Sequence, residues 1–253
     1  MNLTNFSLNN KVALVTGGTS GIGKMMALAL ARAGAFVWIV STRDNADETI
    51  SEIEQQGSEG AFFQVDVTDS NKLETMLSHI YGVSKKIDIL VNAAGINLRI
   101  PAEDLSLDDW QKTMDINLTA PYQLSQLVVK KMKENDWGRI INIASLQSLR
   151  AFDDSIPYGA SKGGVMQLTR ALAQAYSKNG ILVNAIAPGF FHTKLTESLF
   201  QDPEKLKVLA GKTMMNRNGE EEDLFGISVF LCSDANSYIT GQTIFLDGGF
   251  TAQ

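Results

Sequence analysis

The chain of 253 residues has little cysteine and no long apolar run. Its one cysteine, Cys232, rules out an internal disulfide and is consistent with a reducing compartment, while its apolar neighbours favour a buried small side chain near a helix end. No apolar run approaches the roughly 20 residues that span a bilayer, and the polar residues 1–5 lack the apolar core of a signal peptide. We therefore expect a soluble, cytoplasmic protein with no membrane partner.

Basic residues are also scarce. The 22 lysines and arginines are outnumbered by 28 aspartates and glutamates, which gives a net charge of −6. A nucleic-acid partner would need a basic face, and no basic patch is found, so no such partner is expected. Proline-rich linkers, charge blocks and repeats are missing too. We therefore expect residues 1–253 to form a single domain, with ample apolar residues for its core and no metal site.

Short apolar segments rich in Val, Ile or Phe alternate with helix-patterned segments along the whole chain. The predicted strands cover residues 12–16, 36–41, 61–65, 87–91, 138–144, 180–186 and 242–246. The predicted helices cover residues 21–33, 45–57, 69–81, 107–133, 157–178 and 219–232. This repeated order predicts an α/β fold, a single doubly wound parallel sheet with helices on both faces. Ligands of such sheets bind at the carboxyl ends of the strands.

Residues 16–23, Thr-Gly-Gly-Thr-Ser-Gly-Ile-Gly, follow the first predicted strand and open the first helix. Such a turn directs backbone N–H groups and the positive end of the helix dipole at one point, which favours phosphate. Gly17 permits the tight turn, Gly21 the close approach of a pyrophosphate, and Gly23 the packing of helix on strand. The spacing differs from G-x-G-x-x-G, but the order of strand, turn and helix indicates a dinucleotide site.

The second and third strands end in side chains suited to the adenosine half of a dinucleotide. An acid at the second strand end would accept the ribose 2′-hydroxyl, whereas an arginine would pair with a 2′-phosphate. Ser41, Thr42 and Arg43 stand there without an acid, which favours NADP(H) and leaves NAD(H) open. After the third strand, Asp66 beside Val67 either accepts the adenine amine or caps the next helix.

The fourth strand is followed by Asn92-Ala93-Ala94-Gly95, small residues that would give a cofactor access to the backbone, although alone they indicate only a turn. Further along the chain, Tyr158 and Lys162 are four residues apart in a helix that Pro157 opens. An ammonium beside a phenol lowers the pKa of the phenol and makes it a usable acid or base. The alternative is an amphipathic helix with a buried Tyr and a surface Lys.

Two further residues favour the catalytic interpretation. Ser145 follows the fifth strand, where its hydroxyl either hydrogen-bonds a substrate oxygen opposite Tyr158 or forms a local turn. Asn117 lies four residues before Pro121, which has no N–H to bond the Asn117 carbonyl. We hypothesise that an ordered water shared with Lys162 binds that carbonyl and links Tyr158 to solvent as a proton relay.

With these motifs in view, the chain resembles the short-chain dehydrogenase/reductase family over nearly its whole length. The resemblance implies a catalytic tetrad of Asn117, Ser145, Tyr158 and Lys162. It also implies cofactor-binding positions, which together with those argued above are Gly17, Thr19, Ser20, Gly21, Ile22, Gly23, Ser41, Thr42, Arg43, Asp66, Val67, Asn92, Ala93, Gly95, Tyr158, Lys162, Pro188, Gly189 and Thr193. Residues 246–249, Leu-Asp-Gly-Gly, look like the family's C-terminal signature, near the interface of a homotetramer whose dimer faces would be helices 107–133 and 157–178.

The resemblance implies that NAD(P)H delivers hydride to a carbonyl carbon while Tyr158 protonates its oxygen, Ser145 holds that oxygen, and Lys162 also binds the nicotinamide ribose. Residues 190–215 correspond to the family's mobile substrate lid. Four side chains at the strand ends are candidates for binding the substrate: Arg99, Gln147, Arg150 and His192.

The segments around Arg99 and Gln147 look similar to members that act on sugar acids, such as gluconate 5-dehydrogenase and 2-deoxy-gluconate 3-dehydrogenase. The leading expectation is therefore an NAD(P)-dependent oxidoreductase that interconverts a ketone and a secondary alcohol on a sugar acid or polyol. A 3-oxoacyl-acyl-carrier-protein reductase or a broad carbonyl reductase is the alternative enzyme. A protein that binds NAD(P) as a sensor without turnover is the alternative from another class.

Overall fold

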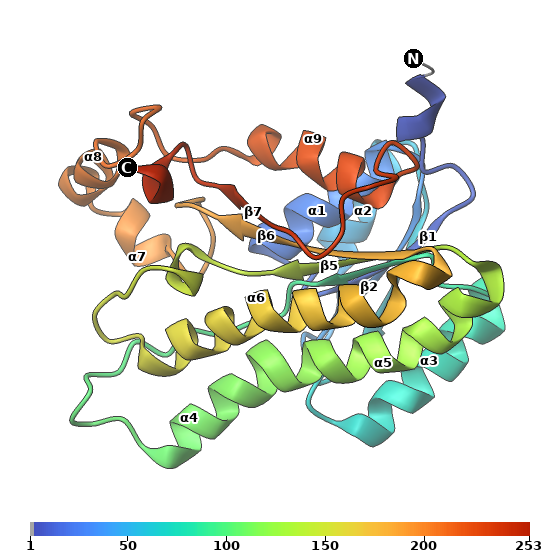
Figure 1. The fold of residues 1–253 in the computed structure, drawn as a ribbon, viewed down its shortest axis with the longest axis horizontal. Coiled ribbons are helices and arrows are strands. Elements are labelled where there is room, and N and C mark those ends of the chain that lie inside the picture. The colour runs from blue at the N-terminus through green and yellow to red at the C-terminus, as the bar shows by residue number, and fades with distance from the viewer. Residues whose placement is uncertain (1–2) are drawn as a thin grey trace.

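Seven parallel strands form one sheet in the computed structural model, which describes residues 3–253 (Figure 1). Met1 and Asn2, part of the polar N-terminal stretch, lie outside the described residues. The strands are β1 (Val12–Thr16), β2 (Phe36–Ser41), β3 (Gly60–Gln64), β4 (Ile89–Asn92), β5 (Gly138–Ile143), β6 (Ile181–Pro188) and β7 (Thr243–Leu246), in the order β3-β2-β1-β4-β5-β6-β7. This order confirms the predicted doubly wound sheet.

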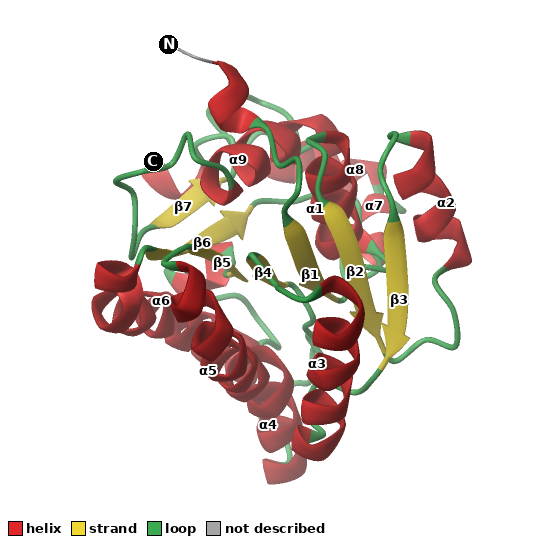
Figure 2. Ribbon diagram, turned by 90° about the vertical axis from the view of Figure 1, so that its right-hand side faces the viewer, coloured by secondary structure: helices red, strands yellow, loops and turns green. Residues whose placement is uncertain are grey.

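Helices cover both faces of the sheet, as Figure 2 shows. One face carries α1 (Gly21–Arg32), α2 (Asp47–Gln55) and α9 (Glu221–Cys232). The other carries α3 (Ser70–Ser84), α5 (Ala120–Met132) and α6 (Ile156–Tyr176), with α4 (Leu107–Met114) preceding α5. Two short helices, α7 (Glu197–Phe200) and α8 (Pro203–Ala210), lie beyond the end of β6 within residues 190–215, for which the sequence predicts a lid without assigning helices.

The central strand β1 shows why both faces must be covered. Its Val12 and Leu14 pack into the cluster beneath α3, α5 and α6, while Ala13 and Val15 pack into the cluster beneath α1 and α9. Every residue of β1 is buried, as expected for a strand between two helical layers. Cys232 is fully buried at the end of α9, which confirms its predicted place, and burial raises the pKa of its thiol to about 12.

The predicted helix 107–133 is interrupted. Between α4 and α5, Asp115–Thr119 form a π-helical turn in which the Ala120 N–H donates to the Asp115 carbonyl, five residues back. Pro121, two residues after this turn, has no N–H with which to continue the usual ladder, and one wider turn accommodates that loss. Within residues 3–253, no helix combines the length and apolarity needed to cross a bilayer.

Candidate active site

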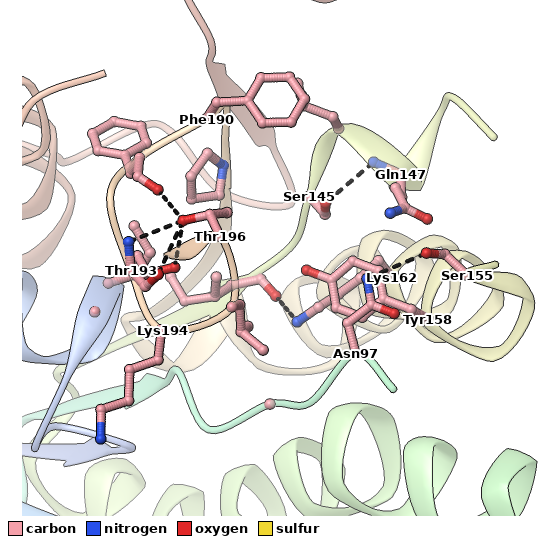
Figure 3. Close-up of a pocket in the computed structure, with 18 of the residues that line it drawn as sticks. Asn97, Ser145, Gln147, Ser155, Tyr158, Lys162, Phe190, Thr193, Lys194 and Thr196 are labelled. Atoms are coloured by element: carbon pink, nitrogen blue, oxygen red, sulfur yellow. Dashed lines mark hydrogen bonds between the residues drawn. The ribbon is translucent and has the colours of Figure 1, made fainter. Parts of the chain in front are cut away.

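A cavity of about 720 Å³ opens at the carboxyl ends of the strands, where the chain leaves β1 and β4 in opposite directions. The lining includes many of the predicted site residues (Figure 3). These are Gly17, Ser20, Gly21, Ile22, Gly23, Ala93, Gly95, Arg99, Ser145, Gln147, Tyr158, Lys162, Pro188, Gly189 and Thr193. The predicted residues outside the lining are Thr19, Ser41, Thr42, Arg43, Asp66, Val67, Asn92, Asn117, Arg150 and His192. The cavity therefore gathers segments from the whole length of the chain.

The glycine turn is shaped by close backbone contacts. Gly17 has φ +68°, and its N–H donates to the Val40 carbonyl at 2.7 Å. A Cβ on Gly23 would lie 2.4 Å from the Gly17 carbonyl oxygen, so only glycine fits there. Ser20 precedes α1 in an extended conformation, and its side chain makes no capping bond. The Ser20 hydroxyl and the first N–H groups of α1 thus fit a phosphate group of a dinucleotide.

The Arg43 side chain contacts the glycine turn. Its Nη1 donates to the Thr19 carbonyl at 3.3 Å, and its backbone N–H donates to Ser41 Oγ at 3.2 Å. Asp66 accepts hydrogen bonds from both the N–H and the hydroxyl of Thr68, at 2.9 and 2.8 Å. The helix α3 is capped instead by Asp69, so the alternative role of Asp66 as that cap is wrong.

The chain after β4 is held by buried polar groups. Thr16 Oγ1 accepts from the backbone N–H groups of Ala93 and Ala94, both at 3.1 Å. Asn92 is buried behind this turn, and its Nδ2 donates to Asn142 Oδ1 at 2.8 Å. Asn92 therefore braces β4 against β5 and does not line the cavity. Sequence reasoning missed the part played by Thr16, although a threonine directly before the glycine turn is the visible signal.

Ser145, Tyr158 and Lys162 are brought together by the packing of α6 beside the end of β5 (Figure 3). Ser145 caps a single 3₁₀ turn, and its Oγ accepts from the Gln147 N–H at 3.2 Å. Lys162 Nζ lies 5.6 Å from the centroid of the Tyr158 ring and donates to the Ile143 carbonyl at 2.6 Å. Lys162 is only 5% exposed, which contradicts the alternative of a surface lysine.

The electrostatics of this group differ from the sequence prediction. Burial raises the pKa of Tyr158 above 10.0, while its hydrogen bond with Ser145 and the charge of Arg99 lower it by less. Burial also lowers the pKa of Lys162 to about 8. The prediction of a lowered Tyr158 pKa is therefore wrong for this structure, because burial, which disfavours the phenolate, has the largest effect on it.

Asn117 lies in the π-helical turn and is 1% exposed. Its side-chain amide pairs with the backbone of Ile96, with Oδ1 accepting at 2.9 Å and Nδ2 donating at 2.9 Å. Nδ2 also reaches Ser161 Oγ on α6 at 3.1 Å. The Asn117 side chain thus braces the segment after β4 against α6 and does not line the cavity, and its carbonyl remains the predicted relay atom.

Of the four predicted substrate residues, two line the cavity. Arg99 has φ +53°, and its Nη2 donates to the Leu195 carbonyl at 3.1 Å. Gln147 lies in the turn after Ser145. The predictions for Arg150 and His192 are wrong for this cavity. Arg150 hydrogen-bonds the carbonyls of Thr251 and Gln253, and the His192 ring stacks on Phe200 with centroids 4.8 Å apart. Both side chains find their partners away from the cavity.

The lining also contains residues that the sequence analysis did not name individually as site residues. These are Ala94, Asn97, Ile143, Ala144, Leu146, Phe152, Asp153, Asp154, Ser155, Phe190, Phe191, Lys194, Leu195, Thr196, Leu199, Lys205 and Leu209. Those from Phe190 to Leu209 fall in the segment predicted as a lid, and the others follow β4 or lie between the end of β5 and α6, where no periodic pattern indicates which side chains point inward. Among residues 3–253, no group of three or more His, Cys, Asp or Glu side chains could hold a metal ion.

Comparison with known proteins gives the family. Residues 17–251 match the family model described as enoyl-(acyl carrier protein) reductase. The chain is 38% identical to gluconate 5-dehydrogenase of Gluconobacter oxydans, over 97% of this chain and 96% of that protein. It is 39% identical to 2-dehydro-3-deoxy-D-gluconate 5-dehydrogenase of Pseudoalteromonas atlantica, over 98% of each.

The fold and its coverage agree with solved structures. A gluconate 5-dehydrogenase from Burkholderia cenocepacia, in complex with NADP and tartrate, superposes with a TM-score of 0.94 at 34% identity and covers 99% of both chains. Matches of this extent leave no part of the sheet or of the cavity outside the comparison. The chain belongs to the short-chain dehydrogenase/reductase family of oxidoreductases.

Proposed function

We propose that this protein interconverts a ketone and a secondary alcohol with NADP(H), and that its substrate is a sugar acid. One observation carries the proposal. Ser145, Tyr158 and Lys162 meet in a cavity whose other side is the glycine turn before α1. A substrate and a nicotinamide can therefore lie in the same cavity within reach of the same phenol.

When bound, NADPH supplies the hydride. In the proposed reduction, Tyr158 donates its phenolic proton to the carbonyl oxygen, while the Ser145 hydroxyl donates a hydrogen bond to that oxygen. The raised pKa of Tyr158 keeps the phenol protonated and ready to act as the acid. Protonated Lys162, with a pKa of about 8, then stabilises the phenolate that forms beside it.

Tyr158 regains its proton from solvent in this proposal through Lys162 and a water on the Asn117 carbonyl. The location of Asn117 supports this role. A Cβ on Gly95 would lie 3.2 Å from Asn117 Oδ1 and 3.7 Å from Lys162 Nζ, so Asn117 and Lys162 approach the same point from different helices. The π-helical turn leaves that stretch of backbone outside the regular hydrogen-bond ladder.

Cofactor preference follows from the second strand end. In our proposal, the glycine turn and Ser20 hold the pyrophosphate, and Arg43 pairs with the 2′-phosphate of NADP(H) from its position against Thr19. No acid stands at the end of β2 to select NAD(H) instead, although NAD(H) would still fit the turn. The NADP bound to the Burkholderia enzyme supports this preference.

The charges of the cavity lining support an anionic substrate. Four cationic side chains line the cavity, against the two carboxylates Asp153 and Asp154, although the chain as a whole carries −6. These cations are Arg99, Lys162, Lys194 and Lys205. An excess of cations suits a carboxylate substrate. The sugar-acid names of both curated relatives support the same class.

Residues 190–215 are proposed as a lid over this substrate, within a single NAD(P)-binding domain of residues 1–253. The segment includes α7 and α8 and contributes Lys194, Leu199 and Lys205 to the lining. The Arg99 guanidinium holds it to the loop after β4 through the Leu195 carbonyl. The two ends of the segment are anchored, because Phe191 is 2% exposed in the core and the Met215 N–H donates to the Gly248 carbonyl at 3.1 Å. The proposed opening is therefore a movement of the middle of the segment, α7 and α8, that leaves the sheet folded.

A second candidate is a reductase of 3-oxoacyl thioesters or a broad carbonyl reductase. The aromatic side of the cavity favours it, because Phe152 and Phe190 lie with centroids 6.2 Å apart and Leu199 and Leu209 line the same cavity. An acyl chain would bury well against these side chains.

We also propose a cytoplasmic homotetramer. Exposed apolar side chains on the expected dimer faces support the assembly: Tyr122 of α5 is 48% exposed and Ile156 of α6 is 50% exposed. The lone cysteine, buried in the core, supports a reducing compartment. Sedimentation of the purified protein would measure the assembly directly.

The test is an absorbance assay with NADPH and NADH in parallel against keto sugar acids, simple ketones and a 3-oxoacyl thioester mimic. Selective turnover of a keto-aldonate with NADPH is expected. Turnover of the thioester alone would favour the second candidate. Tight nucleotide binding without any turnover would favour a sensor and contradict both enzymes.

A further inference from the structure

The Gln147 side chain is the one amide of the cavity lining that makes no hydrogen bond of its own with residues 3–253. Its Oε1 is buried and has no partner. Asn97, the other amide of the lining, does have a partner, because its Nδ2 donates to Ser155 Oγ at 3.3 Å. The unused hydrogen-bonding capacity of Gln147 therefore needs an explanation.

Gln147 is held in place by its backbone. Its N–H donates to Ser145 Oγ at 3.2 Å, within the 3₁₀ turn Leu146–Ser148. The same turn is fixed to α6, because Ser148 Oγ donates to the Lys162 carbonyl at 2.8 Å. The backbone of Gln147 is therefore fixed relative to Ser145 and to α6.

The amide end lies beside the first turn of α6. A Cβ on Gly159, the residue after Tyr158, would lie 3.6 Å from Gln147 Oε1. Figure 3 shows the Gln147 side chain on the same side of the cavity as Tyr158 and Ser155. Gln147 therefore lies beside both residues that are proposed to hold the reacting carbonyl oxygen.

We propose that Gln147 recognises a hydroxyl group on a carbon next to the reacting carbonyl, and so selects polyhydroxylated substrates over plain ketones. A hydroxyl both donates and accepts, so it pairs with whichever end of the amide a rotation presents to it. An apolar substituent at the same place would leave the amide buried and unpaired, which is costly. The proposal rests on the proposed reduction of a ketone and names the substrate group that the site reads.

Ser155 extends the same polar side of the cavity. It is 5% exposed and occupies the position before α6, yet its side chain makes no capping bond to that helix. Its hydroxyl instead accepts from Asn97. The aromatic side chains Phe152 and Phe190 form a different part of the lining, so one cavity offers a polar side and an apolar side to one substrate.

The experiment compares ketones that differ by one hydroxyl. The first comparison pairs 5-keto-D-gluconate with each of two analogues, one without the hydroxyl on C4 and one without the hydroxyl on C6. The second pair is 1-hydroxy-2-butanone and 3-pentanone, in which a methyl group of similar volume replaces the hydroxyl and neither member carries a carboxylate. Values of kcat and KM are measured for the parent, for Gln147→Met, for Gln147→Glu, and for the control Gln167→Met, an exposed glutamine on α6.

The parent is expected to favour the hydroxylated member of each pair by roughly 10-fold or more in kcat/KM, the effect of leaving a buried polar group unpaired. Gln147→Met should abolish this preference, mainly by lowering kcat/KM for the hydroxylated ketone. Gln147→Glu retains a hydrogen-bond acceptor and should therefore retain the preference. Gln167→Met should behave as the parent.

An unchanged preference in Gln147→Met, or equal loss on both members of a pair, would overturn the inference and leave Gln147 a packing residue. Failure of the proposed sugar-acid function would give a different result, because the parent would then reduce the small ketones of the second pair but not 5-keto-D-gluconate or its analogues. If neither pair is reduced, titrating the NADPH-bound protein with gluconate and its deoxy analogues gives the same comparison as a ratio of Kd values.

Discussion

The two sides of the cavity are built in different ways. The side before α1 is made of backbone, with Gly17 and Gly23 at positions where a side chain would collide with neighbouring main chain. The side around Gln147, Arg99 and Lys194 is made of side chains on loops and on the proposed lid. A binding surface made of backbone keeps one shape, whereas the specificity of a surface made of side chains can change by substitution. We therefore expect substitutions on the backbone side to affect cofactor binding and stability, and substitutions on the side-chain side to affect substrate selectivity.

The largest effect is expected where the two sides meet. Tyr158→Phe removes the proposed acid and should lower kcat by about 10²- to 10⁴-fold while leaving the Kd of NADPH nearly unchanged. Rate measurements together with nucleotide titration test this. Tyr176→Phe, at the other end of α6, is the matched control. A Tyr158→Phe enzyme with parental kcat would exclude Tyr158 as the acid.

On the backbone side, Gly23→Ala should weaken cofactor binding and stability together. The new Cβ would lie 2.4 Å from the Gly17 carbonyl oxygen, so the turn must move. We expect a loss of about 1–3 kcal/mol in the free energy of unfolding, with a higher Kd for NADPH. Gly82→Ala in α3 is the control, because nothing lies within 4 Å of its added Cβ. Parental Kd and stability for Gly23→Ala would show that the turn is adaptable.

Lys162 should make stability depend on pH. Its pKa falls from 10.5 to about 8 in the folded chain, so the unfolded chain binds the proton more strongly. Burial of the charge therefore destabilises the protein fully below pH 8, and this cost decreases as the pH rises through the folded pKa toward 10.5. Relative to Lys162→Met, the parent should gain about 1–2 kcal/mol between neutral pH and pH about 9.5. Denaturant titrations at several pH values measure it, and parallel pH curves for the two proteins would contradict it.

The smallest effect concerns cofactor choice. Arg43→Ala should raise the KM for NADPH by roughly 10-fold and leave the KM for NADH unchanged, because only NADPH carries a 2′-phosphate. Parallel assays with both nucleotides test this, with Arg170→Ala, an exposed arginine on α6, as the control. Equal changes for the two nucleotides would mean that Arg43 supports the turn through Thr19 rather than binding phosphate.

The strands, the main helices and the glycine turn could be predicted from sequence because each depends on residues that are close together along the chain. The buried strands have continuous apolar runs, and the glycine turn has a fixed place between β1 and α1. The same locality explains the errors on the other side of the cavity. Arg150 and His192 follow strand ends as predicted, but the direction of each side chain depends on a partner that no periodic pattern indicates: Thr251, 101 residues along the chain, for Arg150 and Phe200 of α7 for His192.

The electrostatic error has a related cause. Spacing shows that Tyr158 and Lys162 lie on one side of α6, yet the pKa of each depends on how much protein surrounds it. That surrounding protein comes from β5, from the loop after β4 and from residues 190–215, which no local pattern brings together. The helices α7 and α8 escaped prediction because they are short and rest on the cavity rim instead of the sheet.

The π-helical turn at Asp115–Thr119 amounts to one extra residue inside a continuous helical rod. If all the residues of this turn were kept but forced into regular α-helix, α4 would rotate about 100° relative to α5, the angle that one residue occupies in an α-helix. Because Leu124 and Val128 hold α5 in the core, the rotation would fall on α4 and on Asn117, whose amide would turn away from Ile96. The wide turn therefore acts as a phase adjustment: it absorbs one residue and keeps the Asn117 side chain directed at both Ile96 and Ser161 of α6.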